Sequence, residues 1–164
     1  MSSENFQIGL TQYFKNDSVL AGLLGKGSDG KPSVHPMHFR DVADPMYPLI
    51  TIARFGSGLH DNMFGEYDVF CTAMDNPKIA ICIWDKQAAI NCWEIFNRVD
   101  FLLRGNPPVN PIPAAGPHPS ANPFLNYKVL RGIVRDDLWD DQINAYHFHA
   151  EYQWWVYNPP SGSL

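Results

Sequence analysis

Two histidines and a glutamate near the end of the chain have the spacing most suggestive of chemistry. His147, His149 and Glu151 occupy alternate positions, and alternate side chains of a β-strand point to one face of the sheet. Two imidazoles and one carboxylate on one face can hold a zinc or iron ion. No fourth ligand is evident in the sequence. A polar, solvent-facing strand is therefore favoured over a metal site, since short motifs often match by chance.

The remaining reactive residue types show no convergent spacing. His35 and His38 flank Pro36-Met37 and would point to opposite faces of a short strand. Cys71, Cys82 and Cys92 lie among apolar residues, which favours small buried hydrophobes over nucleophiles, and Cys92 is expected on the buried side of a helix. The chain has neither a nucleophile-elbow motif nor a phosphate-binding loop. We therefore expect no catalytic residues, no metal and no cofactor.

The composition favours a domain that contacts other protein chains. The 164 residues are 45% hydrophobic, 13% aromatic and only 18% charged, and large aromatic side chains dominate the energetics of cores and interfaces. The net charge is −5 and no basic run is present, which argues against a nucleic-acid binder. An odd number of cysteines and the absence of a long apolar run predict a reducing, aqueous environment without a membrane span.

The first half of the sequence predicts two helices followed by strands. Apolar spacing predicts a helix from Ser3 to Phe14 and a second short helix capped by Asp17, which ends before Gly25. Residues 31–46 contain three prolines, so any strand there is short or at an edge. Apolar runs predict strands at 47–55 and 78–84.

The clearest amphipathic pattern follows the second strand. Asp85 is at an N-cap position, and apolar residues then recur at helical spacing over residues 86–104. The chain ends in two predicted strands, 127–135 and 143–157, with turn residues at Asp136-Asp137 and Asp140-Asp141. Together these elements predict an α+β fold, in which an antiparallel sheet with a long C-terminal hairpin packs against the N-terminal and central helices.

Two features point to contacts between subunits. Residues 105–123 carry seven of the fourteen prolines, which fits either a surface loop or an arm that docks on a neighbour. Adjacent strand residues face opposite sides, so Trp154-Trp155 would place a large ring on each face of the last strand. We expect a single domain over 1–157, a tail at 158–164, and interface residues at Pro107, Pro108, Pro111, Pro113, Trp154 and Trp155.

The order of elements resembles that of tail-terminator and tail-completion proteins of tailed bacteriophages, which share their fold with some head–tail joining proteins. The resemblance covers about residues 4–157 and departs from the family at 105–123 and at a longer 57–77 region. It rests on this element order and on four short strings, Leu23-Leu24-Gly25, Tyr47-Pro48-Leu49-Ile50, Trp84-Asp85 and Leu102-Leu103, followed by the final hairpin.

The resemblance implies a structural virion protein and no enzyme. Such a subunit forms a ring, commonly of six copies, at the head-proximal end of the tail, where it stops tube growth and joins the head connector. Its partners would be other copies of itself, the tail tube protein and the connector or neck protein, with DNA passing through the lumen unbound. It would assemble in the host cytoplasm and remain in the virion.

Two alternatives stay open beside that reading. One is a small metal- or ligand-binding β-domain enzyme that uses His147, His149 and Glu151. The other is a different minor neck or baseplate component with the same kind of assembly chemistry.

Overall fold

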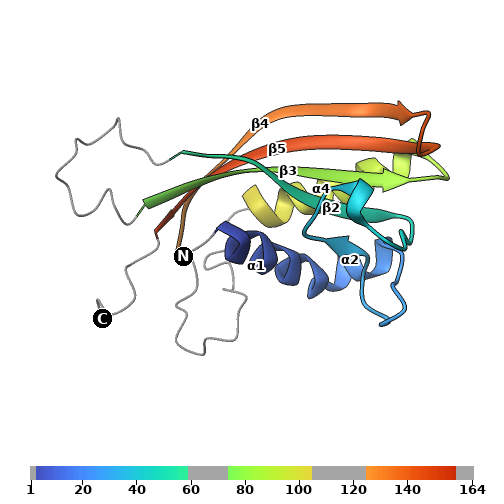
Figure 1. Cartoon of the computed structure of the whole chain (residues 1–164), viewed down its shortest axis with the longest axis horizontal. Coiled ribbons are helices and arrows are strands. Elements are labelled where there is room, and N and C mark those ends of the chain that lie inside the picture. Colours follow the sequence, from blue (N-terminus) through green and yellow to red (C-terminus); the bar gives the residue numbers. More distant parts are fainter. Residues whose placement is uncertain (1–2, 59–73, 105–124, 158–164) are drawn as a thin grey trace.

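Three helices lie on one face of a five-stranded sheet in the computed structural model, which describes residues 3–58, 74–104 and 125–157 (Figure 1). The helices are α1 (Ser3–Lys15), α2 (Ser18–Leu23) and α4 (Ala89–Arg104), with a short 3₁₀ helix η1 (Phe39–Asp41). The strands are β1 (Val34–His35), β2 (Leu49–Gly58), β3 (Met74–Asp85), β4 (Leu125–Asp140) and β5 (Ala145–Tyr157). This arrangement confirms the predicted α+β class.

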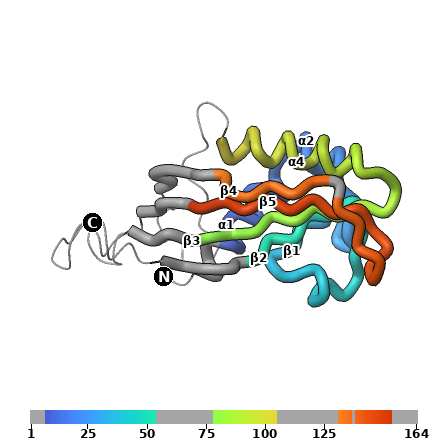
Figure 2. Tube along the Cα trace, turned by 90° about the horizontal axis from the view of Figure 1, so that it is seen from above, coloured from blue at the N-terminus to red at the C-terminus, as the bar shows by residue number. Residues whose placement is uncertain are grey.

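The strands are ordered β1-β2-β3-β5-β4 across the sheet (Figure 2). The pairs β2–β3, β3–β5 and β5–β4 are antiparallel, as predicted, whereas β1 pairs with β2 in parallel. A parallel pair needs a connection of about a dozen residues or more, and residues 36–48 with η1 supply it. The last strand of the chain is therefore an interior strand, and β4 forms an edge.

The helix-facing side of the sheet carries the main core. Ile79, Ile81 and Ile83 of β3 alternate toward the helices, beside Phe148 and Tyr152 of β5. The apolar side of α4 packs on them through residues at spacings of three, four and seven, which makes this helix amphipathic as the sequence predicts. Its buried residues are Cys92, Ile95, Phe96, Val99, Leu102 and Leu103.

Charged side chains fix the helices to one another and to the sheet. The Asp17 carboxylate caps α2 by accepting a hydrogen bond from the Leu20 amide, and it also accepts two hydrogen bonds from Arg98 of α4. On the same helix, Asp100 accepts hydrogen bonds from Arg131 of β4 and from the buried Tyr152 hydroxyl of β5. One carboxylate thus joins α4 to two neighbouring strands.

The helix after β3 begins later than predicted. Asp85 is the last residue of β3, and α4 begins at Ala89 instead of residue 86. The carboxylate of Asp85 still accepts hydrogen bonds from the Ala88 amide and the Asn91 side chain. The capping role of Asp85 is therefore confirmed in part, but it acts across a three-residue connection.

The predicted turn at Asp136-Asp137 is wrong, because β4 continues to Asp140. Register shifts between Arg131 and Val134 and between Arg135 and Leu138 absorb the extra residues as bulges. The turn follows Asp140, whose carboxylate accepts the Gln142 and Ile143 amides. It ends at Asn144, which has φ of 57°, a left-handed conformation that asparagine tolerates well.

Four strands run beyond the helix layer. β2, β3, β4 and β5 continue past the ends of α1 and α4 (Figure 1), and they remain paired as far as Gly58–Asn76, Met74–Tyr157 and Leu125–Tyr157. We call the part of the sheet beyond Gln153 of β5 the sheet extension. Trp154 and Trp155 of β5 belong to this extension.

Several predictions fall outside the described residues. They are the burial of Cys71, the proline-rich segment 105–123 and the tail at 158–164. Among the helices that the structure describes, none combines the length and the apolar character needed to cross a bilayer.

Candidate functional site

The reactive side chains predicted from the sequence meet on the face of the sheet opposite the helices. His147 and His149 of β5 pair with Trp84 and Cys82 of β3, and Glu151 pairs with Ala80. These residues alternate with the core residues of the same strands, so they share one face. Figure 2 looks onto this face, which none of the described helices covers. The prediction that His147, His149 and Glu151 lie on one face is confirmed.

Cys82 completes the cluster that the two histidines begin. The Cys82 Sγ atom lies 3.2 Å from His149 Nδ1, and His149 Nε2 lies 3.1 Å from Glu151 Oε1. Ligand atoms of Cys82, His147 and His149 all lie within 4.8 Å of one another. We call Cys82, His147, His149 and Glu151 the sheet-face cluster.

The hydrogen bonds of His149 fix the role of each ring nitrogen. A carboxylate can only accept, so Nε2 carries the proton and donates to Glu151. In a neutral ring with this tautomer, Nδ1 is the unprotonated nitrogen and is placed to accept from the Cys82 thiol. The lone pair of His149 therefore points at the sulfur atom, and its N–H group points at a carboxylate.

Aromatic residues hold His147 in place. The indole of Trp84 stacks on the imidazole with ring centroids 4.1 Å apart and an interplanar angle of 3°. Trp84 is itself fixed by a hydrogen bond from its Nε1 to the Thr51 hydroxyl and by contact with Phe39. His147 Nε2 is buried and has no hydrogen-bond partner, which is an unfavourable state for a polar atom.

Burial controls the protonation of Cys82 and His147 in the sheet-face cluster. The pKa of His147 is lowered to about 4, mainly by burial and also by the neighbouring His149, against the opposite effect of Asp140. The pKa of Cys82 is raised to about 12, mainly by burial and also by Glu151, against the opposite effect of a hydrogen bond with Thr51. At neutral pH, His147 is a neutral imidazole and Cys82 is a thiol.

The cluster has the donor types of a soft or borderline metal site rather than of a hydrolytic triad. A catalytic cysteine needs a thiolate in the absence of a metal, and the surroundings of Cys82 oppose its ionisation, whereas a coordinated zinc ion would itself deprotonate the thiol. Sulfur and imidazole nitrogen are instead the preferred ligands of zinc. The sequence-based interpretation of Cys82 as a small hydrophobe missed this contact. One signal in the sequence was available. Cys82 and Trp84 are two residues apart on the strand, so they share the face opposite to that of Ile81 and Ile83.

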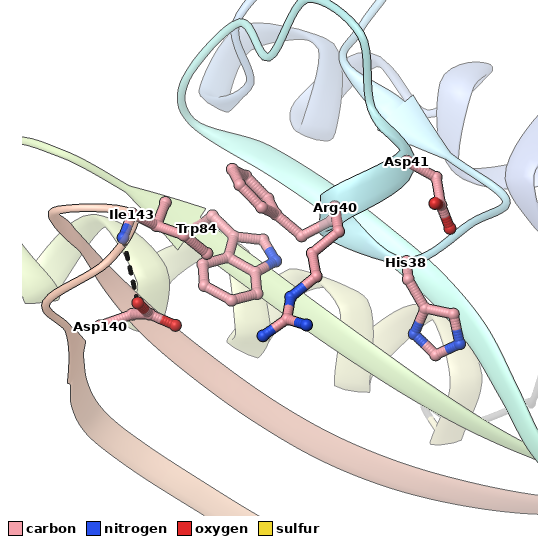
Figure 3. A pocket seen from close by; sticks show the side chains of 7 residues that line it. His38, Arg40, Asp41, Trp84, Asp140 and Ile143 are labelled. Carbon is pink, nitrogen blue, oxygen red and sulfur yellow. Dashed lines mark hydrogen bonds between the residues drawn. The ribbon is translucent and has the colours of Figure 1, made fainter.

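A hollow of about 450 Å³ opens beside the cluster, between η1 and the β4–β5 turn. Trp84 forms its floor, and Figure 3 shows the Arg40 guanidinium reaching in front of the indole while Asp41 points away. Asp140 and Ile143 line the opposite side, and His38 lies at the rim; Phe39 completes the lining. The hollow offers an indole face and one guanidinium, without a pair of groups arranged for acid–base catalysis among these lining residues.

His35 and His38 do not form a site together. His35 Nε2 on β1 lies 2.9 Å from the hydroxyl of Ser33, the residue just before that strand, whereas His38 is exposed at the hollow. Cys92 is buried on the core side of α4, as predicted.

The predicted interface residues lie at the margins of what the structure describes. Trp154 and Trp155 are in β5, where they pair with Val129 and Lys128 of β4. Because β5 is flanked by β3 and β4, a partner could reach it by its faces and not by its edge. The prolines of 105–123 lie outside the described residues.

Comparison with known proteins shows likeness at the level of structure and not of sequence. No protein-family model matches the chain, and no curated protein is detectably similar to it. Among solved structures, the chain is similar to one from the virion of a native gene transfer agent particle. The two share 10% sequence identity with a TM-score of 0.48, over 94% of this chain and 96% of that one. A likeness at this level carries no argument about function.

Proposed function

We propose that the chain is a structural virion protein that forms a ring at the head-proximal end of a phage tail. In this role it ends the tail tube and joins it to the connector. The proposal extends the family resemblance of the sequence, whose order of helices and strands agrees with the described fold. Its partners are other copies of itself, the tube protein and the connector or neck protein.

The sheet extension is the observation that carries the proposal. Four paired strands continue past the helix layer (Figure 1), so the described helices leave both faces of the sheet there uncovered. A sheet normally buries at least one face against another layer. The extension includes the Trp154-Trp155 pair of β5. A neighbouring copy is the covering layer that we propose for it.

Exposed apolar side chains elsewhere support contacts with other chains. Ile133 and Trp139 of the edge strand β4 are 52% and 46% exposed. The bulges in β4 interrupt its backbone edge, a device that discourages uncontrolled strand pairing. Contacts through side chains, between different patches on successive copies, can close into a ring.

The experiment measures the assembly state of the purified full chain by light scattering and electron microscopy. We expect closed rings. Replacing Trp154 and Trp155 by serine should shift the mass toward the monomer, and so should deleting residues 107–121. Phe101→Ser is the control, because it removes an aromatic side chain that is 60% exposed on α4, outside the sheet extension.

Circular dichroism separates failed assembly from failed folding. The proposal holds if the Trp variants keep the secondary structure of the parent and lose the ring, while Phe101→Ser keeps both. A parent protein that stays monomeric at every concentration would refute it. Rings that form equally well in the Trp variants and in the deletion would remove the extension and the proline-rich segment from the interface.

A further inference from the structure

Cys82, His147 and His149 bring three possible metal-ligand atoms within 4.8 Å of one another, an observation that does not depend on the proposed function. We propose that Cys82, His147 and His149 bind one zinc ion on the open face of the sheet, with Glu151 as the carboxylate that orients His149. The site joins the two central strands β3 and β5. Its remaining coordination position is left for water or for a donor from another molecule.

The distances suit tetrahedral coordination. Zinc–sulfur bonds of about 2.3 Å and zinc–nitrogen bonds of about 2.0–2.1 Å place neighbouring ligand atoms about 3.3–3.7 Å apart. Cys82 Sγ and His149 Nδ1 are already 3.2 Å apart, and the ligand atoms of all three residues lie within 4.8 Å. Small side-chain adjustments would bring all three ligand atoms to these separations.

Glu151 supplies the second observation. A metal-bound histidine almost always donates its other N–H to a carboxylate or carbonyl, which fixes the ring and strengthens the ligand. His149 has this arrangement before any ion binds, since Nε2 lies 3.1 Å from Glu151 Oε1 while Nδ1 faces the sulfur. A purely solvent-facing strand gives no reason for the lone pair to point at a thiol on the next strand.

Charge and access also favour the ion. A Cys82 thiolate together with the Glu151 carboxylate would balance the two positive charges of zinc in a half-buried place. The side chains of His149 and Glu151 are 24% and 28% exposed, so an ion can enter from the open face. Arg135 pairs with His149 from β4 and is exposed, which leaves its charge to be screened by water.

The four positions are fixed by the sheet and not by a loop. Cys82 and His149 are direct cross-strand partners, as are Trp84 and His147. The stacked indole limits the rotation of the His147 ring. Sites on regular strands hold their geometry better than sites on loops, so the ion would bind without reorganising the fold.

The test uses untagged full-length protein, stripped of metal and titrated with Co²⁺ as a spectroscopic probe for zinc. We expect one equivalent to bind, with tetrahedral d–d bands and a thiolate-to-cobalt charge-transfer band, and zinc to displace it. Cys82→Ser should abolish the charge-transfer band. Cys71→Ser and Cys92→Ala are the controls, and each should keep it.

Two further variants distinguish the ligands from the orienting residue. His149→Gln should remove binding altogether, whereas Glu151→Gln should keep the stoichiometry and weaken the affinity by about 10–100-fold. Glu94→Gln, on the exposed side of α4, should leave the affinity unchanged. Unfolding midpoints with and without zinc confirm that each variant folds.

Absence of a charge-transfer band in the folded parent protein would overturn the proposal. Its persistence in Cys82→Ser would do so as well, because the thiolate would then come from another cysteine. If Cys82→Ser does not fold, His149→Gln decides the question by the same titration. Ring formation is measured separately, so failure of this site leaves the proposed assembly role standing.

Discussion

At the scale of single residues, acidic side chains connect elements that the backbone alone would leave independent. Asp17 serves α2 as its N-cap and α4 as the partner of Arg98. The hydrogen bond from Arg98 holds the pKa of Asp17 below its ordinary value, against the opposite effect of burial. Burial acts to raise the pKa of Asp100, but hydrogen bonds from Arg104 and Tyr152 outweigh it and the pKa is lowered. Both carboxylates therefore favour the folded state in their ionised form.

The pH dependence of this contribution can be measured at Asp17. A lowered folded-state pKa stabilises the protein above the ordinary value of 3.8, and the contribution is lost as the pH falls through the folded-state pKa. Asp17→Asn keeps a good N-cap acceptor but removes the ion pair. We expect it to cost about 1 kcal/mol of unfolding free energy at pH 7, since the pair is partly exposed.

Urea unfolding from pH 7 down to pH 3 provides the measurement. The difference between the parent and Asp17→Asn should shrink as the pH falls below about 4. Asp44→Asn, at an exposed position, is the charge-matched control and should run parallel to the parent. A gap of constant size over the whole range would show that the capping geometry, and not the charge, is responsible.

At the scale of elements, the end of α2 is set by a close backbone approach. The Gly25 amide donates to the Pro48 carbonyl, and its own carbonyl accepts from the Ser33 amide. A Cβ atom at Gly25 would lie 2.5 Å from the Met46 carbonyl oxygen and 2.7 Å from that of Tyr47. Only glycine leaves enough space here. The two hydrogen bonds of Gly25 hold the connection between β1 and β2 against the end of α2.

A pair of glycine substitutions tests this argument. Gly25→Ala should lower the unfolding free energy by about 1–3 kcal/mol, because the obstructing atoms are backbone. Gly22→Ala is the matched control, in an exposed position of α2 where an added Cβ meets nothing within 4 Å. It should raise the stability by about 0.5–1 kcal/mol. Equal effects of the two substitutions in urea unfolding would contradict the proposed contact.

At the scale of the whole molecule, the fold has one covered face and one open face. The helices bury the apolar side of the sheet, while the other side carries the sheet-face cluster and, beside η1, a small second core of Leu49, Trp84 and Ala145. The strands then run on past the helix layer. Among the described residues no helix covers this face or the strand ends, and exposed apolar surface of that kind favours contacts with other chains, in keeping with the proposed assembly.

The charge of the molecule predicts its behaviour toward DNA. With 12 basic and 17 acidic side chains and a net charge of −5, it lacks the basic surface that phosphate binding needs. We expect a dissociation constant for duplex DNA weaker than about 10⁻⁴ M at physiological salt. Fluorescence anisotropy with a labelled duplex measures this directly. Micromolar binding that weakens steeply with salt would contradict the proposal that DNA passes through the ring without being bound.

Most helices and strands could be predicted from short-range signals in the sequence. Helical spacing and the caps at Asp17 and Asp85 located α1, α2 and α4, and apolar runs located β2 and β3, because these signals act over a few neighbouring residues. The same reasoning placed a turn at Asp136-Asp137, where β4 in fact continues. The local composition there is typical of a turn, but two bulges accommodate these residues within β4. Bulges depend on pairing with the partner strand, so the local sequence does not reveal them.

Contacts between residues far apart in the chain follow from the packed fold and could not be predicted from local sequence. The alternation of His147, His149 and Glu151 was visible in the sequence, but Cys82 is 67 residues away from His149. Their contact depends on β5 inserting between β3 and β4 in one register. A shift of one residue would turn every side chain of β5 to the other face. That register is selected by the burial of Phe148, Ala150 and Tyr152 against α4, a property of the assembled core and not of any local segment.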